Sequence, residues 1–378
     1  MSKIDELRSK IDALDDELST LYEKRLGLSK EIGEEKIESK SPIDVKDREE
    51  SILFRVLGNI KDEQKKMYVK QLYDLIFLQS KNYQRSLQTT HSKQIDAFRA
   101  ILEAPRKYIP LSASIACQGV EGAYSEMASR RLFEVPHITY FKTFDSVINA
   151  VNSGLCEYGV LPLENSTAGS VLPVYDALSD KKCFIIRSVQ IDVGHCLAVI
   201  NKNAKIKTIY SHPQALEQCK NYIKSIGATP IATDNTAASA RLVKESGDES
   251  VAAICNEDCA SLYGLEVKEK DIQDNGVNKT TFICISKDLQ VTRDANKVSI
   301  LTTLEHKPGS LSALLNRFYI ERLNLTKLVS RPRLLRDDEF MFYFDFEGDV
   351  EKNSVINLLS DLENTEEVFT FLGCYKDM

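Results

Sequence analysis

The fold of the N-terminal part is decided by the stretch IDELRSKIDALDDELSTLYEKRLGLSKEIGEEK, residues 4–36. Its aliphatic residues recur at alternating intervals of four and three, which places them along one side of an α-helix. The stretch contains no proline, so we predict one continuous helix of about 30 residues, roughly 45 Å long. The apolar seam consists of Ile4, Leu7, Ile11, Leu14, Leu18, Leu21, Leu28 and Ile32.

Two more helical segments follow, and no strand pattern lies between them. We expect Gly33 and residues 39–42 to end the first helix, a second helix to run from residues 44–47 to 58, and a third from 62 to 87. A first helix this long has to bury its seam against helices of its own chain or of a second copy. The pattern predicts an all-α unit that forms a homodimer or a higher homo-oligomer.

The seam carries one charge, Arg25, where an aliphatic residue is due. A lone arginine there is often one that reaches the surface or forms an interhelical ion pair. Lys36, however, returns to within about 20° of the same face, and Ser80 and Gln84 share a face of the third helix. Cationic and neutral donors that converge in a helical core predict a pocket for an anion.

The N-terminal residues resemble the all-helical class of chorismate mutases over about residues 3–88. That resemblance implies an intertwined dimer in which Arg8 reaches the partner's site. Independently, Arg8 and Arg25 lie roughly 26 Å apart along one helix, too far to hold one small substrate. The matching residues are Leu7, Arg8, Ile11, Leu14, Asp15, Arg25, Gly33, Lys36, Pro42, Arg48, Glu49, Ser80 and Gln84.

The reaction of that family turns chorismate into prephenate by an intramolecular rearrangement. It needs a compact substrate conformer and stabilised charge on the breaking ether oxygen, but no base, nucleophile or metal. By resemblance, Lys36 and Gln84 donate to that oxygen, while Arg25 and the partner's Arg8 hold the two carboxylates. Of the other matching residues, Glu49 binds the hydroxyl group, and Arg48 and Ser80 complete the wall. Val45 stands where the family often has an acid.

Composition excludes several classes of function. A chain of 378 residues predicts two or three domains. The net charge of −7, with acidic and basic residues interleaved, gives no basic face for nucleic acid. We find neither a membrane-length apolar stretch nor a signal peptide, so no membrane partner and a cytoplasmic location are expected. The nine cysteines form no CxxC pair, which favours buried small residues over disulfides or a zinc site.

The middle region alternates predicted strands with predicted helices, which indicates a mixed α/β fold of two lobes. The predicted strands are residues 114–117, 158–163, 195–200, 208–210, 251–255 and 281–286, and the predicted helices are residues 126–133, 144–152, 213–226, 236–244 and 258–262. Residues 118–125 form a glycine turn before a helix, a suitable seat for a carboxylate or phosphate. Polar clusters follow strands at residues 162–170, 211–214 and 278–282; each could cap a helix, but together they favour a ligand site. His195 and His212 are expected to be structural hydrogen-bonders, and we predict no metal site.

Six ordered motifs in this region resemble prephenate dehydratase over residues 113–287: GVEGAYSE, YGVLPLENSTAGSV, GHCL, IYSHPQALEQC, ASLYGLEV and NKTTF. The resemblance implies two α/β lobes like those of periplasmic binding proteins, and loss of carbon dioxide and hydroxide from prephenate. It assigns the essential hydroxyl group to Thr280, with Glu164, Asn165 and Ser166 orienting the substrate. Thr281 stands where the family usually has arginine.

The C-terminal region predicts strands and helices in the order βαββαβ, the ferredoxin-like plan. Residues 308–312 and 330–332 resemble the two effector motifs of the ACT domains that are fused to such enzymes. Those ACT domains bind phenylalanine between subunits. Val329 replaces the usual glutamate of the second motif. The expected effector-binding residues are Gly309, Ser310, Leu311, Ser330 and Arg331.

The sequence as a whole predicts a bifunctional chorismate mutase/prephenate dehydratase of phenylalanine biosynthesis that is inhibited by L-phenylalanine and needs no cofactor. The expected parts are a mutase domain (1–90), a linker (91–112), a dehydratase domain (113–288) and an ACT domain (296–378). One alternative keeps only one of the two activities, as Val45 and Thr281 suggest. Another is an amino-acid-responsive binding protein without turnover, against which Arg25 and Lys36 argue.

Overall fold

The computed structural model describes residues 2–43, 45–88, 110–180, 183–274, 276, 278–291, 294–332, 339–365 and 368–378. The chain divides into two compact units. The first contains residues 1–99, 304–323 and 352–367, and the second contains the remainder. The linker expected over residues 91–112 lies almost wholly outside the described residues. Within the described ranges, no helix combines the length and apolar character needed to cross a membrane.

Three helices form the N-terminal part, as expected: α1 (Lys3–Ser39), α2 (Lys46–Gly58) and α3 (Glu63–Gln88). α1 begins at a capping box formed by Ser2 and Asp5. It continues through Gly33 and ends at Ser39, so residues 39–42 end the helix as expected but Gly33 does not. The reason is packing: a Cβ atom on Gly33 would lie 3.0 Å from Cγ of Gln84, so the missing side chain lets α1 and α3 approach closely.

The apolar seam of α1 is uncovered in a single chain. Its eight predicted positions are 50% to 63% exposed, whereas Ser29 on the face toward α3 is 6% exposed. Such a stripe of large aliphatic side chains on one helix is the kind of surface that proteins bury against a partner.

The second unit is built on a sheet of ten strands within the described residues. Nine follow the order β13-β14-β12-β15-β5-β11-β3-β1-β2, and β4 pairs with β3. Helices α6 and α7 pack on one face around Leu161 and Ile283, and α5 packs on the other face around Val160 and Phe282. The elements outside the C-terminal region are β1 (Ser112–Gln118), α5 (Tyr124–Leu132), β2 (Val135–Phe141), α6 (Phe144–Asn152), β3 (Tyr158–Asn165), β4 (Gly169–Ser170), α7 (Leu172–Asp180), β5 (Phe184–Asp192) and β11 (Lys279–Ser286).

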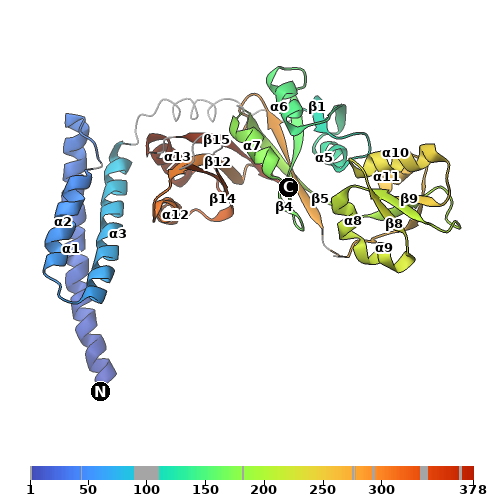
Figure 1. Cartoon of the computed structure of the whole chain (residues 1–378). Coiled ribbons are helices and arrows are strands. Elements are labelled where there is room, and N and C mark those ends of the chain that lie inside the picture. Colours follow the sequence, from blue (N-terminus) through green and yellow to red (C-terminus); the bar gives the residue numbers. More distant parts are fainter. Residues whose placement is uncertain are drawn as a thin grey trace. The chain divides into compact units, whose positions relative to one another are not determined.

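A second lobe is inserted between β5 and β11. Its sheet has the order β10-β6-β9-β7-β8 in the described chain. Helices α10 and α11 cover one face, while α8 and α9 cover the other (Figure 1). The predicted two-lobed α/β architecture is therefore confirmed. The bounds are β6 (Cys196–Val199), β7 (Thr208–Ser211), α8 (Pro213–Gln218), α9 (Lys220–Ile226), β8 (Thr229–Ala232), α10 (Thr236–Ser246), β9 (Val251–Cys255), α11 (Glu257–Leu262) and β10 (Glu266–Glu269).

The C-terminal elements follow the predicted order βαββαβ. β15 lies between β12 and β5, so the C-terminal strands continue the sheet of the first lobe. Helices α12 and α13 are grouped with the first unit. The bounds are β12 (Lys297–Glu305), α12 (Ser310–Ile320), β13 (Leu325–Pro332), β14 (Glu339–Glu347), α13 (Asn353–Thr365) and β15 (Phe369–Asp377).

All nine cysteine side chains are buried. In the second lobe, Cys196, Cys255 and Cys259 are at most 2% exposed and belong to one apolar cluster with Ala240 and Val243 of α10. The expectation that cysteines serve as small core residues is confirmed.

Candidate functional sites

The seam arginine of α1 turns toward α3 rather than toward water. Nη1 of Arg25 donates to the Ser80 hydroxyl oxygen at 2.5 Å, and its guanidinium group lies 5.9 Å from the centre of the Phe77 ring. Ser80 is 6% exposed, and its own hydroxyl donates to the Ile76 carbonyl oxygen. Arg25 is thus held by a neutral hydroxyl group and an aromatic face, both of which leave its charge uncompensated.

Lys36 and Gln84 meet in the same helical core. Nζ of Lys36 donates to Oε1 of Gln84 at 3.4 Å and to the Ile43 carbonyl oxygen at 2.9 Å. Gln84 is 7% exposed, and Gly33 lies one turn before Lys36 against the same glutamine. Neutral acceptors hold this ammonium group in place without neutralising it.

The other mutase residues occupy different positions. Glu49 forms an ion pair with Lys81 of α3 at 3.1 Å, a partner that the sequence analysis did not identify. Arg48 and Val45 are exposed. The side chain of Arg8 is 73% exposed and lies 4.0 Å from Asp5, its ion-pair partner on α1. The single chain therefore brings together Arg25, Lys36, Ser80 and Gln84 but leaves Arg8 outside their site.

The predicted dehydratase hydroxyl lies where β3 and β11 pair. Thr280 stands opposite Asn165, whose Nδ2 donates to Oγ1 of Thr280 at 2.9 Å and to Oδ1 of Asn278 at 2.7 Å. Oδ1 of Asn165 accepts from the backbone N–H groups of Thr167 and Ala168. Asn165 therefore fixes both the loop after β3 and the hydroxyl group of Thr280. Because that oxygen accepts from Asn165, its proton is available to a ligand.

Ser166 contacts the same end of β11 through two hydrogen bonds with Lys279. Its hydroxyl oxygen accepts from the Lys279 N–H group at 2.9 Å, and its own N–H group donates to the Lys279 carbonyl oxygen at 2.8 Å. The two contacts fix the backbone of the residue that precedes Thr280.

Glu164 lies on a different side of the sheet from Thr280. The register shifts between Thr281 and Phe282, and after this bulge Glu164 stands opposite Thr281 while Asn165 stands opposite Thr280. Successive side chains of a strand point to opposite faces, so the Glu164–Thr281 and Asn165–Thr280 pairs face opposite ways. Oε2 of Glu164 accepts from Nζ of Lys327 at 2.7 Å.

A cavity of about 210 Å³ opens beside the Asn165 network. Gln218, on the second lobe, is one of its lining residues, and its Oε1 accepts from Nδ2 of Asn278 at 3.2 Å and lies 2.9 Å from Nε2 of His195. Its buried Nε2 has no hydrogen-bond acceptor among the residues described. An amide donor of this kind can bind an acceptor of a ligand in the cavity. The complete lining is Thr167, Glu217, Gln218, Gln273, Asp274 and Asn278.

The sequence analysis missed Gln218, although it lies within the quoted motif that starts at Ile209. Nothing in a helical glutamine reveals a partner 60 residues away. The two histidines are structural, as expected: His212 caps α8 by accepting from the Gln214 N–H group, and burial lowers the pKa of His195. His195 therefore stays neutral beside Gln218 at neutral pH.

A carboxylate of the chain itself occupies the anion site expected at the glycine turn. The Gly122 N–H group donates to Oε2 of Glu126 at 2.7 Å, and the Tyr140 hydroxyl group donates to the same oxygen at 2.8 Å. Burial opposes the charge of Glu126, but these donors and Arg130 outweigh it and hold the pKa of the carboxyl group below its usual value. This turn stabilises a carboxylate of the chain itself, so we exclude it from the ligand site.

The expected effector residues lie on separate elements. Gly309 precedes α12 with a φ of +90°, and Ser310 and Leu311 form the first turn of that helix. On β13, Arg331 forms a two-pronged ion pair with Asp176 of α7, at 2.9 and 2.6 Å. Ser330 is exposed and, as the neighbouring residue, points to the opposite face of the strand.

Two family models match the chain. The model for chorismate mutase type II matches residues 7–85, and the model for prephenate dehydratase matches residues 115–290. The bifunctional chorismate mutase/prephenate dehydratase of Escherichia coli strain K12 is 30% identical, with 98% of this chain and 95% of that protein covered.

Two further relatives cover the part outside the helical domain. The prephenate dehydratase of Methanocaldococcus jannaschii is 38% identical over 68% of this chain and 95% of its own. The crystal structure of the Arthrobacter aurescens prephenate dehydratase in complex with L-Phe has a TM-score of 0.63 and 27% identity, covering 69% of this chain and 89% of that one. The chain carries both activities, chorismate mutase and prephenate dehydratase, and belongs to the bifunctional chorismate mutase/prephenate dehydratase family of phenylalanine biosynthesis.

Proposed function

We propose that chorismate is rearranged at the site formed by Arg25, Lys36, Ser80 and Gln84. The observation that carries this proposal is that two cations face a helical core with neutral partners. Arg25 binds a substrate carboxylate while Ser80 holds its guanidinium group in place, and Lys36 and Gln84 donate to the ether oxygen as its bond breaks. No proton has to be transferred in this reaction. Catalysis comes instead from the fixed positive charge, because its interaction with the substrate is strongest in the transition state.

A second copy of the chain completes this site. The exposed seam of α1 supports a dimer, because eight large aliphatic side chains on one helix are buried when two such helices pack together. Arg8 supports it as well, since its exposed side chain is free to reach across to the partner's pocket and bind the second carboxylate. Glu49, held by Lys81, binds the substrate hydroxyl group, and Arg48 closes the wall.

We propose that Thr280 drives the second reaction. As the bond to the ring carboxylate breaks, its electron pair moves into the ring and the hydroxyl group leaves from the opposite carbon; the Thr280 hydroxyl group donates its hydrogen bond to that leaving oxygen. Asn165 sets the direction of this donor, and the unpaired amide of Gln218 binds an acceptor of the substrate. The products are carbon dioxide, phenylpyruvate and hydroxide, which takes a proton from the solvent to become water.

The two activities are tested together by supplying chorismate to the purified full-length protein. We expect prephenate to appear first and phenylpyruvate to follow without any added enzyme or cofactor. Chromatography of quenched samples measures both products. Accumulation of prephenate with no phenylpyruvate would show that only the mutase is active, and phenylpyruvate formed from supplied prephenate but not from chorismate would show that only the dehydratase is.

We propose that the C-terminal region is an ACT domain that binds L-phenylalanine through Gly309, Ser310, Leu311, Ser330 and Arg331. The βαββαβ order and the L-Phe complex of the Arthrobacter aurescens relative support this. In isothermal titration of the full chain we expect saturable heat with L-phenylalanine and none with D-phenylalanine. The absence of heat at millimolar L-phenylalanine contradicts the assignment.

A further inference from the structure

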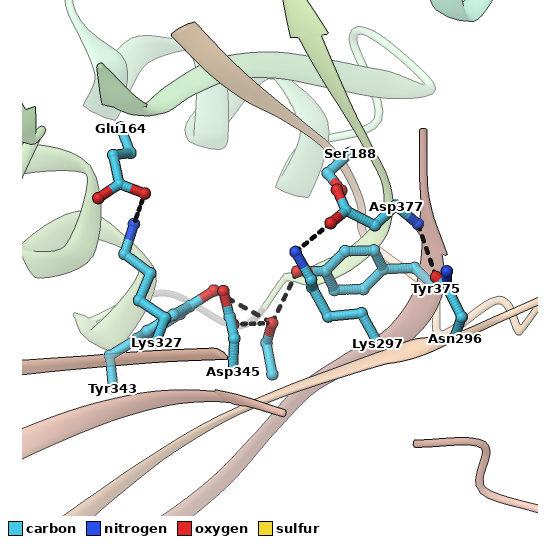
Figure 2. A network of polar contacts seen from close by, with 10 residues as sticks. Glu164, Ser188, Asn296, Lys297, Lys327, Tyr343, Asp345, Tyr375 and Asp377 are labelled. Atoms are coloured by element: carbon cyan, nitrogen blue, oxygen red, sulfur yellow. Dashed lines mark hydrogen bonds and ion pairs between the residues drawn. The ribbon is translucent and has the colours of Figure 1, made fainter. Parts of the chain in front are cut away.

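A lysine of the C-terminal strands reaches into the first lobe and binds a carboxylate at the end of β3. Nζ of Lys327, on β13, donates to Oε2 of Glu164 at 2.7 Å (Figure 2). The lysine side chain is 12% exposed, and its ammonium group lies 5.4 Å from the centre of the Tyr175 ring on α7. The Glu164 side chain is 43% exposed, so water reaches the carboxylate of this pair while its ammonium group is largely shielded.

A buried carboxylate stands opposite this lysine on the neighbouring strand. Asp345, on the neighbouring strand β14, is 4% exposed and accepts from the Ser299 hydroxyl group at 2.5 Å (Figure 2). Burial raises the pKa of Asp345, while the positive charges of Lys297 and Lys327 oppose that shift. Lys327 therefore lies between Asp345 in the core of the C-terminal sheet and Glu164 in the dehydratase lobe.

The same face of β13 makes further contacts with the lobe. Lys327, Val329 and Arg331 alternate along the strand and point the same way. Val329 packs on the core formed by β3, α6 and α7, and Arg331 forms its ion pair with Asp176. The row of Lys327, Val329 and Arg331 is consequently fixed to the dehydratase lobe at both of its ends. Lys327 forms the end that lies nearest to the loop after β3.

Glu164 is joined by one peptide bond to Asn165, the residue that directs the Thr280 hydroxyl group. The two neighbours face opposite ways, so Glu164 points to Lys327, while Asn165 points to Thr280 and to Asn278, which lines the cavity. A displacement of the Glu164 backbone has to turn the Asn165 side chain. Turning it breaks the hydrogen bonds that this side chain donates to three acceptors.

We propose that Lys327 and Glu164 form a positioning pair that sets the orientation of Asn165 and thereby of the Thr280 hydroxyl group. Glu164 then acts through Asn165 and leaves substrate contact to Gln218 and Thr280. The dehydratase site then depends on a residue of β13, the strand that also carries Ser330 and Arg331, two of the residues proposed to bind phenylalanine. This inference rests on the proposed dehydratase role of Thr280.

The test is Lys327→Met in the full chain, assayed separately with chorismate and with prephenate. We expect kcat for prephenate dehydration to fall by about tenfold to hundredfold with KM changed by less than about threefold, because a misdirected donor affects the transition state more than substrate binding. Lys327→Arg, which keeps the charge, is expected to recover most of kcat. Mutase activity stays at the wild-type level and reports that the protein is folded.

Lys297→Met is the matched control. Lys297 is also a largely buried lysine of the same sheet, 17% exposed, and its ion-pair partner is Asp377 rather than Glu164. We expect it to lower the melting temperature about as much as Lys327→Met while dehydratase kcat stays within about twofold of wild type. An equal loss of kcat in both variants overturns the inference, since any weakening of the sheet would then suffice.

A double-mutant cycle with Glu164→Gln separates coupling from independent effects. If the two residues act as one pair, the double variant Lys327→Met/Glu164→Gln loses no more kcat than the more damaging single variant. Additive losses overturn the inference, as does a wild-type kcat for Lys327→Met. If Thr280→Val leaves kcat for prephenate dehydration at the wild-type value, the proposed role of Thr280 is wrong, an outcome that this variant distinguishes from those of Lys327→Met.

Discussion

Replacing Lys36 by methionine is expected to lower kcat for chorismate rearrangement by about 10³-fold, because the breaking ether oxygen loses its only cationic donor in the proposed site. Methionine keeps the length of the side chain, so the close packing of α1 on α3 at Gly33 is preserved. Dehydratase activity on supplied prephenate stays unchanged, since Thr280 and Asn165 lie in the other unit. Initial rates with each substrate, measured on the same preparation, give the comparison.

Mixed dimers supply the control for this variant. A dimer of two Arg8→Ala chains, or of two Lys36→Met chains, has no complete mutase site. A dimer with one chain of each kind has one complete mutase site, in which an intact Lys36 meets the partner's intact Arg8. Random mixing then restores about one quarter of the wild-type mutase sites. If both activities disappear in folded Lys36→Met, the two sites are not separate, and if mixing restores nothing, Arg8 does not act across the dimer.

Replacing Thr280 by valine is expected to lower kcat for prephenate dehydration by about 10²- to 10³-fold, because the leaving oxygen loses its hydrogen-bond donor. Valine has nearly the shape of threonine, and Thr280 is 9% exposed, so the cost to folding is limited to the hydrogen bond from Asn165. The mutase rate should remain at its wild-type value. Both are measured by following chorismate and prephenate consumption separately.

The neighbouring residue provides the control for this second prediction. Thr281→Val makes the same chemical change one position further along β11, on the face opposite to Thr280. We expect dehydratase kcat to stay within about threefold of wild type. Equal losses of dehydratase kcat in the two variants would show that the catalytic face of β11 has been misassigned, and with it the catalytic hydroxyl group.

The sequence predicts the helical site well because its residues belong to helices with a clear period. Arg25 and Lys36 lie on one face of α1, and Ser80 and Gln84 on one face of α3, so helix geometry alone brings each pair together. The carbonyl group of Ile43 and the ion pair between Lys81 and Glu49 could not be predicted in this way. They depend on how the loop after α1 and the helix α2 fold back, and no periodicity encodes that.

The α/β part shows where a periodic pattern stops being informative. β9 and α6 begin and end where predicted, because each is a short apolar run between polar turns. β5 was missed, although it lies between β15 and β11 in the sheet, because Arg187 interrupts its apolar run and both of its faces are largely buried. α8 and α9 were predicted as one helix; the break falls at Cys219, whose backbone leaves the helical range.

Long-range pairs explain the remaining gaps. The motif around Thr280 predicts that this residue supplies the hydroxyl group, but its partner Asn165 is 115 residues away, and only the register of β3 with β11 joins them. Glu164 was expected to orient the substrate, and its ion pair with Lys327, 163 residues away on β13, has no signature in the sequence. The domain boundaries and the effector residues remain predictions.

The position of β15 constrains the order in which the protein can be completed. β15 follows every other strand of the ten-stranded sheet in the chain, yet it lies in the interior of that sheet, parallel to β5 at Arg187 and Ser188. While the ribosome is still making the C-terminal region, β5 has already emerged and presents an unpaired edge. The nascent dehydratase lobe must therefore be protected from pairing with other chains until translation has passed residue 377.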